Sequence, residues 1–253
     1  MFNLYRQFQE FTQGTYTHSR SITLLDMKQG DVNGDGIIDN VYLYGNKPDG
    51  IFADNITLLI QDGHSNQSTT VNLQNNAGYH PTLFLGDFSK DNVKDILVSI
   101  DTGGSGGYGI FYIYSFKNNI LYEMFDVEKY NKEYKFNVNY EDFYKVSVGS
   151  PQLDVLFTID ISYKGYDYLS QYYYENGKLK QPIKGEVLAL GALYPIVTNE
   201  RMGYDLLAFQ RIIGTSNSDT LGYVENLLTW NGTQFTSSRL SVSILGTKLI
   251  SLF

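Results

Sequence analysis

Residues 30–44 read GDVNGDGIIDNVYLY and contain the most distinctive pattern in the sequence. A short acidic loop is followed at once by a strand-like run of apolar and aromatic residues. The loop has oxygen-bearing side chains at positions one, three, five and nine, and glycine at position six: Asp31, Asn33, Asp35, Asp39 and Gly36. Calcium takes about six to eight oxygen ligands, and the glycine permits a turn that brings in the carbonyl of position seven, Ile37. The loop is therefore predicted to hold a structural calcium ion.

The calcium loop is expected to lie between strands rather than between helices. An EF-hand would place a bidentate glutamate at position twelve, but that residue is Tyr42, inside the strand pattern. A second loop, residues 87–95, repeats the acids at positions one, five and nine: Asp87, Asp91 and Asp95. Ser89 offers a neutral ligand there, whereas Lys90 and Lys94 reduce the local negative potential. We expect this second site to be weaker than the first, or empty.

Strand-like segments continue on both sides of these loops. Runs rich in Val, Ile, Tyr, Phe and Thr alternate with clusters of Gly, Asn and Asp, and helical periodicity is scarce. The expected strands include residues 40–44, 56–60, 96–100, 110–116, 155–161, 206–209 and 227–230. The sequence therefore predicts an all-β fold.

Two markers recur along the chain at a similar period. An aspartate followed by an apolar run occurs at Asp39, Asp95, Asp154 and Asp205, with separations of 56, 59 and 51 residues. A tight-turn pair, which supplies the positive φ angles of a hairpin, lies 22 to 26 residues after each aspartate: Asp62-Gly63, Asn118-Asn119, Asn176-Gly177 and Asn231-Gly232. Together they predict a repeated four-stranded antiparallel blade.

The repeat predicts a β-propeller formed by one domain, residues 1–253. The repeat units are expected at about 22–78, 79–133, 134–186 and 187–239, with no Pro-rich linker between them. Residues 1–21 and 240–253 are apolar enough to add strands, so the termini can complete a further blade together. Five blades are preferred because 253 residues divided by five gives about 51, near the repeat length. Four blades are the alternative.

Residues 30–39 and 85–98 resemble FG-GAP or VCBS-type repeats, the blades of integrin α-subunit-like β-propellers, here expected in a bacterial protein. In that family the acidic loop joins the first two strands of a blade and carries calcium. The resemblance implies these ligands: Asp31, Asn33, Asp35, Ile37 and Asp39, then Asp87, Ser89, Asp91, Val93 and Asp95. Units three and four lack the acidic loop, so no calcium is expected in them.

Composition excludes several other functions. The chain has 27 acidic and 19 basic residues, a formal charge of −8, which argues against nucleic acid or an anionic membrane surface as a partner. It has no cysteine, which excludes disulfides and thiolate chemistry. No run reaches the roughly 18 apolar residues of a membrane helix, and the N-terminus lacks the core of a signal peptide. Calcium loops of modest affinity fill where calcium is abundant, so a cell-surface, secreted, envelope or coat location is still favoured.

Catalytic patterns are weak in this sequence. Residues 103–107 fit the nucleophile-elbow pattern around Ser105, but that motif must open a helix and a strand is expected instead. His18, His64 and His80 are not spaced as metal ligands. Asp101 and Asp160 each follow a repeat aspartate by six residues. If neighbouring blades bring them together, they form a glycosidase-like carboxylate pair.

Aromatic residues are the remaining signal. The chain has 22 tyrosines, with runs at Tyr108, Tyr112 and Tyr114 and at Tyr163, Tyr166, Tyr168, Tyr172, Tyr173 and Tyr174. Alternation along strands should pack most of them between blades and leave some exposed. An exposed patch near the glycine-rich loop would suit recognition of a sugar or protein. We expect a non-enzymatic binding or adhesion module; the alternatives are a carbohydrate-active enzyme using Asp101 and Asp160 and a structural coat or envelope protein.

Overall fold

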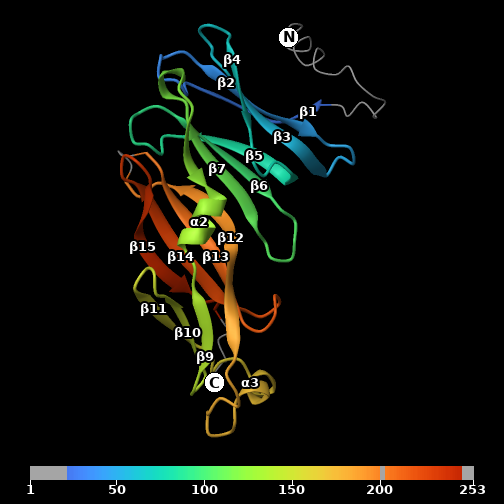
Figure 1. Ribbon diagram of the computed structural model, residues 1–253, viewed down its shortest axis with the longest axis vertical. Helices are drawn as coiled ribbons and strands as arrows, with labels where there is room; N and C mark the ends of the chain where they lie inside the picture. Colours follow the sequence, from blue (N-terminus) through green and yellow to red (C-terminus); the bar gives the residue numbers. More distant parts are fainter. Residues whose placement is uncertain (1–21, 200–202, 247–253) are drawn as a thin grey trace, which may run out of the picture.

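The computed structural model describes residues 22–199 and 203–246 of the chain. These residues form an elongated all-β molecule of two antiparallel sheets that follow one another along its long axis (Figure 1). The all-β prediction is therefore confirmed. Residues 1–21, including His18, and residues 247–253 lie outside the described residues, and with them most of the blade that the termini were expected to share.

The first sheet contains the N-terminal eight strands. They are β1 (Ile22–Gly30), β2 (Asp39–Asn46), β3 (Phe52–Gln61), β4 (Ser68–Asn72), β5 (Gly78–Gly86), β6 (Asp95–Asp101), β7 (Gly109–Ser115) and β8 (Tyr122–Asp126). Their order is β1-β2-β3-β5-β6-β7-β8, and β4 pairs with β3 beside this path. The sheet curls so that β1 lies alongside β5, where the Leu83 N–H donates to Asp26 Oδ2 (2.7 Å).

The second sheet contains the C-terminal seven strands. They are β9 (Asn137–Glu141), β10 (Lys145–Ser150), β11 (Val155–Asp160), β12 (Lys184–Ile196), β13 (Asp205–Ile213), β14 (Thr220–Trp230) and β15 (Phe235–Ser243), in the order β11-β10-β9-β12-β13-β14-β15. Strand β12 joins its two halves, since it pairs with β9 through residues 184–186 and with β13 from there to its end.

The expected four-stranded unit occurs three times. Strands β1–β4, β5–β8 and β12–β15 each form an antiparallel meander, which corresponds to the first, second and fourth predicted units. The third predicted unit, residues 134–186, has three paired strands and a helix instead. The first two meanders are also joined by hydrogen bonding between β3 and β5. The described residues thus show repeated antiparallel units, and the blade count is not confirmed.

Two hydrophobic cores share the second sheet. The larger core lies between the first sheet and the upper halves of β12–β14, and the smaller one lies between β9–β11 and the lower halves of β13–β15. On β13, Leu206 and Ala208 belong to the larger core and Ile212 to the smaller. Gln210 lies between them, and its amide donates to the carbonyls of Tyr134 (3.2 Å) and Leu188 (3.1 Å). A buried polar position therefore separates the two cores.

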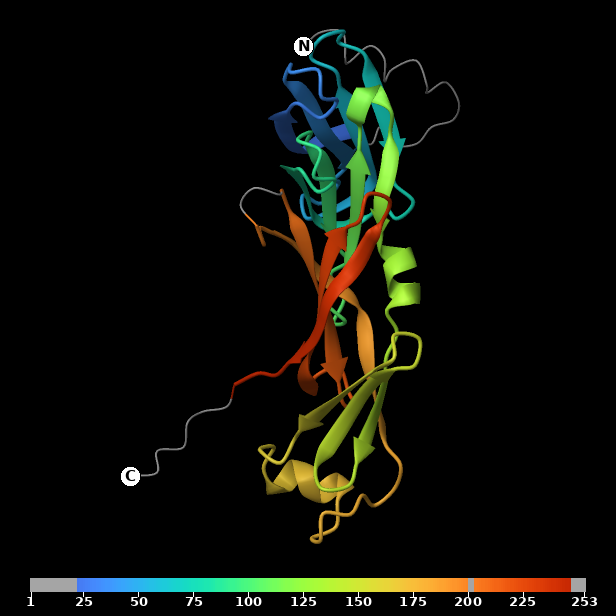
Figure 2. The same cartoon turned by 90° about the vertical axis from the view of Figure 1, so that its left-hand side faces the viewer.

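Short helices interrupt the strands at three places: η1 (Lys117–Asn119), α2 (Val127–Glu133) and α3 (Tyr166–Tyr172). Helix α2 lies at the side of the molecule between its upper and lower parts, and α3 lies at the lower tip (Figure 2). The prediction that the tyrosines from Tyr163 onward alternate along a strand is wrong, because residues 166–172 form helix α3. Residues four apart share one face of a helix, so Tyr168 and Tyr172 are both partly buried, whereas Tyr166 is exposed. The described part of the chain has no helix with the length and apolarity of a membrane span.

Candidate functional site

The first acidic loop connects β1 to β2 and is organised by its own side chains. The carboxylate of Asp31 accepts hydrogen bonds from the N–H groups of Gly34 (2.6 Å) and Gly36 (2.9 Å). The side-chain oxygens of Asn33 and Asp35 each accept from the amide two residues on, at 3.0 and 2.7 Å. Both glycines have φ of +85°, a conformation that disfavours side chains, so the predicted sharp turn is present.

Asp39, the last residue of the loop pattern, accepts hydrogen bonds from the backbone at the start of the loop. It is fully buried; its Oδ2 accepts from the N–H groups of Val32 (2.9 Å) and Asn33 (3.3 Å), and its Oδ1 accepts from Gly63 N–H (2.9 Å). Gly63 belongs to the turn between β3 and β4, one of the predicted turn pairs. Asp39 therefore ties the loop to the hairpin of the same meander.

The loop partly fits a calcium ion. Each carboxylate oxygen has two acceptor directions, so the hydrogen bonds made by Asp31 and Asp35 leave capacity for a cation. The amide of Asn33 and the carbonyl of Ile37 add the neutral oxygens that calcium accepts. Asp39 fits less well, because it is turned toward backbone amides. Within residues 22–199 and 203–246, no group of three or more acidic, histidine or cysteine side chains is gathered as if around a metal.

The second acidic loop, between β5 and β6, forms a similar turn, in which the first aspartate again accepts hydrogen bonds from backbone amides of the loop. Asp87 accepts from the N–H groups of Asp91 (3.1 Å) and Asn92 (2.9 Å), and Asp91 accepts from the amide two residues on (3.0 Å). Lys90 and Asn92 have φ of +63° and +65° at the places of the two glycines. The sequence repeat of the first two units is therefore a structural repeat as well.

The second loop differs from the first in two ways: a lysine pairs with one of its acids, and its buried aspartate lacks one hydrogen-bond donor. The ammonium of Lys117 pairs with Asp91 Oδ2 (2.8 Å), which places a cation of the chain itself against this loop. Asp95 Oδ2 accepts from Phe88 N–H (2.9 Å) and Ser89 N–H (2.8 Å), but its Oδ1 is buried with no hydrogen-bond partner in the described residues. Burial raises the pKa of Asp95 to about 6, although these two hydrogen bonds oppose the rise.

The fourth predicted unit shares the buried aspartate. Asp205 begins β13 and accepts a hydrogen bond from the exposed Thr198 hydroxyl; its largely buried carboxylate also pairs with the ammonium of Lys90 (2.7 Å). The loops also stack, since Lys94 N–H donates to Asp31 O (3.3 Å) and Tyr204 N–H to Asp87 O (2.8 Å). By contrast, the repeat aspartate of the third unit, Asp154, is exposed. Its alignment with the other three reflected chance spacing.

The glycine-rich loop between β6 and β7 packs on the second sheet through Arg211. The guanidinium of Arg211, on β13, donates to the carbonyls of Ser105 (2.9 Å), Gly106 (3.4 Å) and Asn217 (2.8 Å). Asn217 Nδ2 donates to the Ser105 hydroxyl (3.3 Å), and the strand β7 follows. The loop thus leads into a strand, where the nucleophile-elbow motif requires a helix.

Beside this loop lies a hollow of about 380 Å³ on the face of β12–β14. It is lined by the glycines of the loop together with Ala189, Gly191, Ala192, Phe209, Arg211 and Tyr223. The rings of Tyr194, Phe209 and Tyr223 follow one another edge to face, with centroids 5.8 and 6.4 Å apart. We name these three rings the aromatic platform. It occupies the place, near the glycine loop, where an exposed aromatic patch was expected.

The two carboxylates of the enzymatic alternative are not brought together. Asp101 ends β6 in the first sheet, where its Oδ2 lies 3.5 Å from His80 Nδ1. Asp160 ends β11 in the second sheet, where the Lys145 ammonium and the Ser162 amide hold its pKa below the ordinary range. Both carboxylates are exposed, and each has its own basic partner. The other histidine in the described residues, His64, donates its backbone N–H to Asp62 (2.8 Å).

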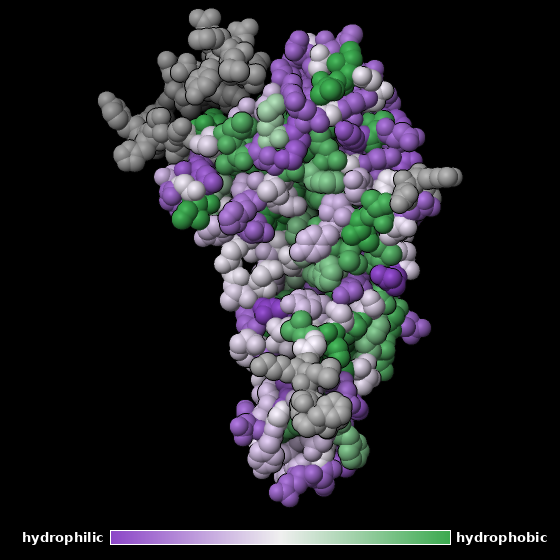
Figure 3. All heavy atoms as spheres, turned by 180° about the vertical axis from the view of Figure 1, so that it is seen from behind, coloured by the Kyte–Doolittle hydropathy of each residue, from purple (hydrophilic) through white to green (hydrophobic). Residues whose placement is uncertain are grey.

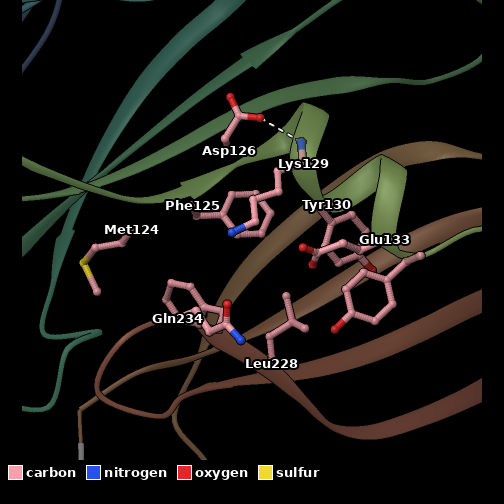
Figure 4. Close-up of a pocket in the computed structure, with 10 residues that line it drawn as sticks. Met124, Phe125, Asp126, Lys129, Tyr130, Glu133, Leu228 and Gln234 are labelled. Atoms are coloured by element: carbon pink, nitrogen blue, oxygen red, sulfur yellow. Dashed lines mark hydrogen bonds between the residues drawn. The ribbon is translucent and has the colours of Figure 1, made fainter. Parts of the chain in front are cut away.

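A crevice between α2 and the β14–β15 hairpin has side chains of both parts around it (Figure 4). Its volume is about 40 Å³, far below the roughly 300 Å³ at which ligand pockets begin. Phe125, Tyr130 and Leu228 surround it and belong to the larger core. It is therefore a packing gap where α2 meets the second sheet.

Sequence reasoning missed the contacts that hold these sites in place. Lys117, Arg211 and Gly63 reach residues 24 to 106 positions away, and no local pattern reveals such contacts. Helix α2 had a local signal that went unused: Asp126 accepts from Lys129 N–H (2.8 Å) as its N-cap, ahead of apolar residues at helical spacing.

Comparison with known proteins gives a family. The family described as the YybI C-terminal domain matches residues 134–243, which contain β9–β15. The chain is 45% identical over 222 residues to the uncharacterized protein YybI of Bacillus subtilis (strain 168), and the match covers 87% of this chain and 85% of that protein. No solved structure matches the chain significantly. With identity of this extent over most of both sequences, the chain belongs to the YybI family.

Proposed function

We propose that this protein is a non-enzymatic binding module, stabilised by calcium, that recognises a glycan or protein through the aromatic platform. The observation that carries the proposal is the row of Tyr194, Phe209 and Tyr223 beside a hollow of about 380 Å³. Ligand pockets usually measure about 300 to 1,000 Å³ and combine aromatic walls with few polar groups. The hollow has both properties.

Arg211 supports this proposal because it fixes one wall of the hollow. Its guanidinium holds the backbone of the glycine-rich loop through two carbonyls, and glycines offer their peptide groups to a ligand without side chains in the way. Among the residues that line the hollow, Arg211 carries the charge, and both of its terminal nitrogens already donate to groups of the protein. The ligand group that enters is therefore expected to be uncharged.

Binding to a glycan array, with a reducing-sugar assay on the same oligosaccharides, tests this function. We expect binding without turnover, and a loss of at least tenfold in affinity for Phe209→Ala and Tyr223→Ala, since each aromatic contact contributes on the order of 1 kcal/mol or more. Tyr122→Ala, an exposed tyrosine on β8, serves as the control. Turnover that is lost in Asp101→Asn would instead establish the enzymatic alternative.

The calcium part of the proposal concerns the first acidic loop. Asp31, Asn33, Asp35 and the carbonyl of Ile37 would hold the ion, with Asp39 supporting the loop from beneath. Asp87, Ser89, Asp91, Val93 and Asp95 would form the second, weaker site, where Lys117 already neutralises part of the charge. Bound calcium would stabilise the folded state by mass action and hold the loops that stack at this end of the molecule.

Calcium titration gives a direct measurement of this part. We expect the wild type to take up calcium in calorimetry and its melting temperature to rise by several degrees in excess calcium, on the order expected for 1 to 3 kcal/mol. Asp35→Ala should abolish the rise, whereas Asp167→Ala, an exposed acid on α3, should leave it intact. Absence of calcium uptake by the wild type would contradict the metal site.

We propose further that the meanders β1–β4 and β5–β8 are blades of the FG-GAP or VCBS type in an open propeller-like arrangement. Three features support this: the acidic loop joins the first two strands of each unit, a buried aspartate lies under each loop, and the first strands β1 and β5 run side by side.

A second function, a structural coat or envelope component, is favoured by the two strands that form the edges of the second sheet within residues 22–199 and 203–246. Strand β11 ends this sheet with Leu156 72% exposed, and β15 ends the other side. Hydrophobic residues gather along the side of the molecule where β15 runs (Figure 3). Unpaired edges of this kind promote pairing between copies. Light scattering should then show concentration-dependent assembly that Leu156→Lys reduces; a monomer at all concentrations would exclude this function.

A further inference from the structure

A second pocket lies beside α3, at the lower tip of the molecule (Figures 1 and 2), away from the acidic loops of the first sheet. Its volume is about 310 Å³, and it lies between α3 and the turn that follows it. The residues that line it are Tyr144, Tyr166, Leu169, Ser170, Tyr173, Tyr174, Glu175 and Lys180. Four tyrosines in one pocket account for part of the tyrosine run that the core does not absorb.

The tyrosines divide into a floor and two walls. Tyr173 is buried and meets the ring of Tyr144 edge to face, with centroids 5.0 Å apart, which gives the pocket an apolar floor. Tyr166 and Tyr174 are 76% and 56% exposed. A large aromatic side chain that stays exposed leaves its hydrophobic surface unburied, and a ring-shaped ligand between the two walls would cover it.

The rim of the pocket carries balanced polar chemistry. Glu175 supplies a carboxylate that accepts hydrogen bonds, and Lys180 supplies an ammonium that donates them, so their charges cancel. One donor of Lys180 is engaged by Ser170 O (2.6 Å), and its ammonium lies 5.9 Å from the Tyr174 ring, which leaves further donors available. This rim favours a neutral ligand whose groups both donate and accept.

The pocket is held in its shape by hydrogen bonds behind α3. Tyr168 OH donates to Asp219 Oδ2 (2.6 Å), Tyr140 OH and Tyr168 OH are 2.7 Å apart, and the ammonium of Lys164 pairs with the same carboxylate. Asp219 lies between β13 and β14, so this network fastens α3 to the second sheet. The backbone of α3, which carries Tyr166, is therefore already in place before a ligand binds, and this reduces the entropy lost on binding.

We infer that this tip pocket is a second binding site, and that it takes a neutral saccharide ring stacked between Tyr166 and Tyr174. Sugar rings combine an apolar face, which packs on aromatic rings, with hydroxyl groups that donate to Glu175 and accept from Lys180. The inference does not depend on the aromatic platform, which lies elsewhere on the second sheet and uses different residues.

Calorimetric titration of the full chain with neutral tetrasaccharides tests the site; cellotetraose, chitotetraose and maltotetraose are suitable probes. At least one is expected to bind with a Kd of about 1 mM or tighter. Tyr166→Ala and Tyr174→Ala should each weaken this binding at least tenfold. Tyr163→Ala is the matched control, because Tyr163 is 41% exposed on the same segment but does not line the pocket.

The controls also separate this site from the platform. Tyr223→Ala should leave binding at the tip unchanged, and Tyr166→Ala should leave binding at the platform unchanged. The inference is overturned if none of the three tetrasaccharides binds, or if Tyr163→Ala weakens binding as much as Tyr166→Ala. Tighter binding of a proline-rich peptide than of any tetrasaccharide, lost in the same two variants, would also overturn it by assigning the pocket to peptides.

Discussion

At the scale of single residues, the two acidic loops differ by one backbone donor. Asp39 receives three N–H groups, the third from Gly63, whereas Asp95 receives two. The residue that corresponds to Gly63 in the second meander is Asn119, whose N–H donates to Phe116 O instead (3.0 Å). The same buried carboxylate is therefore fully satisfied in one loop and incompletely satisfied in the other.

Replacement of Asp39 by alanine should destabilise the protein strongly even without calcium. Three N–H groups, two of them buried with Asp39, would lose their acceptor; each such loss costs about 1 to 3 kcal/mol, so the free energy of unfolding should fall by about 3 to 5 kcal/mol. Urea unfolding in EDTA measures this effect. Asp35→Ala, an exposed position in the same loop, should change it by less than about 1 kcal/mol; equal losses would contradict the structural role of Asp39.

Asp95 should lower the stability of the protein as pH rises, whereas a carboxylate in an ion pair raises stability as pH rises. Its folded pKa of about 6 lies above the ordinary value of 3.8. Between these values the folded state binds more protons than the unfolded state, so the free energy of unfolding falls as pH rises from about 4 to about 6. The difference between the two pKa values corresponds to about 3 kcal/mol at most.

Asp95→Asn isolates this contribution, because the amide stays neutral and can still accept from Phe88 and Ser89. In EDTA, the variant should gain stability relative to the wild type as pH rises from 4 to 7, as measured by urea unfolding at each pH. Asp54→Asn serves as a comparison outside the loops. A difference between wild type and Asp95→Asn that stays constant with pH would mean that Asp95 titrates normally.

The residues of the first site were predictable because the chemistry is local. Positions 31–39 form one turn, so the spacing of oxygen side chains and glycines already describes its hydrogen bonds. The turn of the second loop was predictable for the same reason, whereas a weaker calcium site there, expected from Lys90 and Lys94, stays a prediction. Lys117 was not predictable, because it reaches Asp91 from 26 positions away.

At the scale of elements, strands were predictable and short helices were not. The expected runs at 40–44, 56–60, 96–100, 206–209 and 227–230 all lie within strands, since alternation and β-branched residues mark half-buried strands directly. Helices α2 and α3 have seven residues each, too few for helical periodicity to stand out. In α3, packing against Tyr140 and the Asp219 network decides the conformation of a tyrosine-rich segment.

Gln210, the buried polar residue between the two cores, should contribute to the free energy of unfolding through its hydrogen bonds. Gln210→Met keeps the size of the side chain but leaves the carbonyls of Tyr134 and Leu188 without their donor. Because Gln210 Oε1 is itself buried without a partner, its removal offsets part of the loss. We expect a net decrease of about 1 to 2 kcal/mol in the free energy of unfolding. Gln234→Met, the same substitution at an exposed position, should have almost no effect; equal effects would contradict this role.

At the scale of the whole molecule, the second sheet joins two cores into one structure. Its lower half packs with β9–β11, and its upper half covers the first sheet. The ion pair of Lys90 with Asp205 and the stacked loops connect the same two sheets at one edge. The family match to residues 134–243 would favour an independent C-terminal domain, whereas this packing argues that the segment needs the first sheet.

The isolated segment of residues 134–243 should therefore fail to form a monomeric, cooperatively folded domain. It would expose the face that carries Leu190, Leu193, Leu206, Ala208 and Leu228, all buried in the larger core. Exposure of one such leucine lowers the free energy of unfolding by about 1.5 to 3 kcal/mol. Exposure of the whole face therefore removes a large part of the roughly 5 to 15 kcal/mol that stabilises a domain. We expect dye binding to exposed apolar surface and concentration-dependent association in light scattering. The same segment with Leu206→Lys and Leu228→Lys should bind less dye and associate less, because the charges break the apolar face. A monomeric segment with a sharp unfolding transition and no dye binding would show instead that the smaller core suffices for an independent fold.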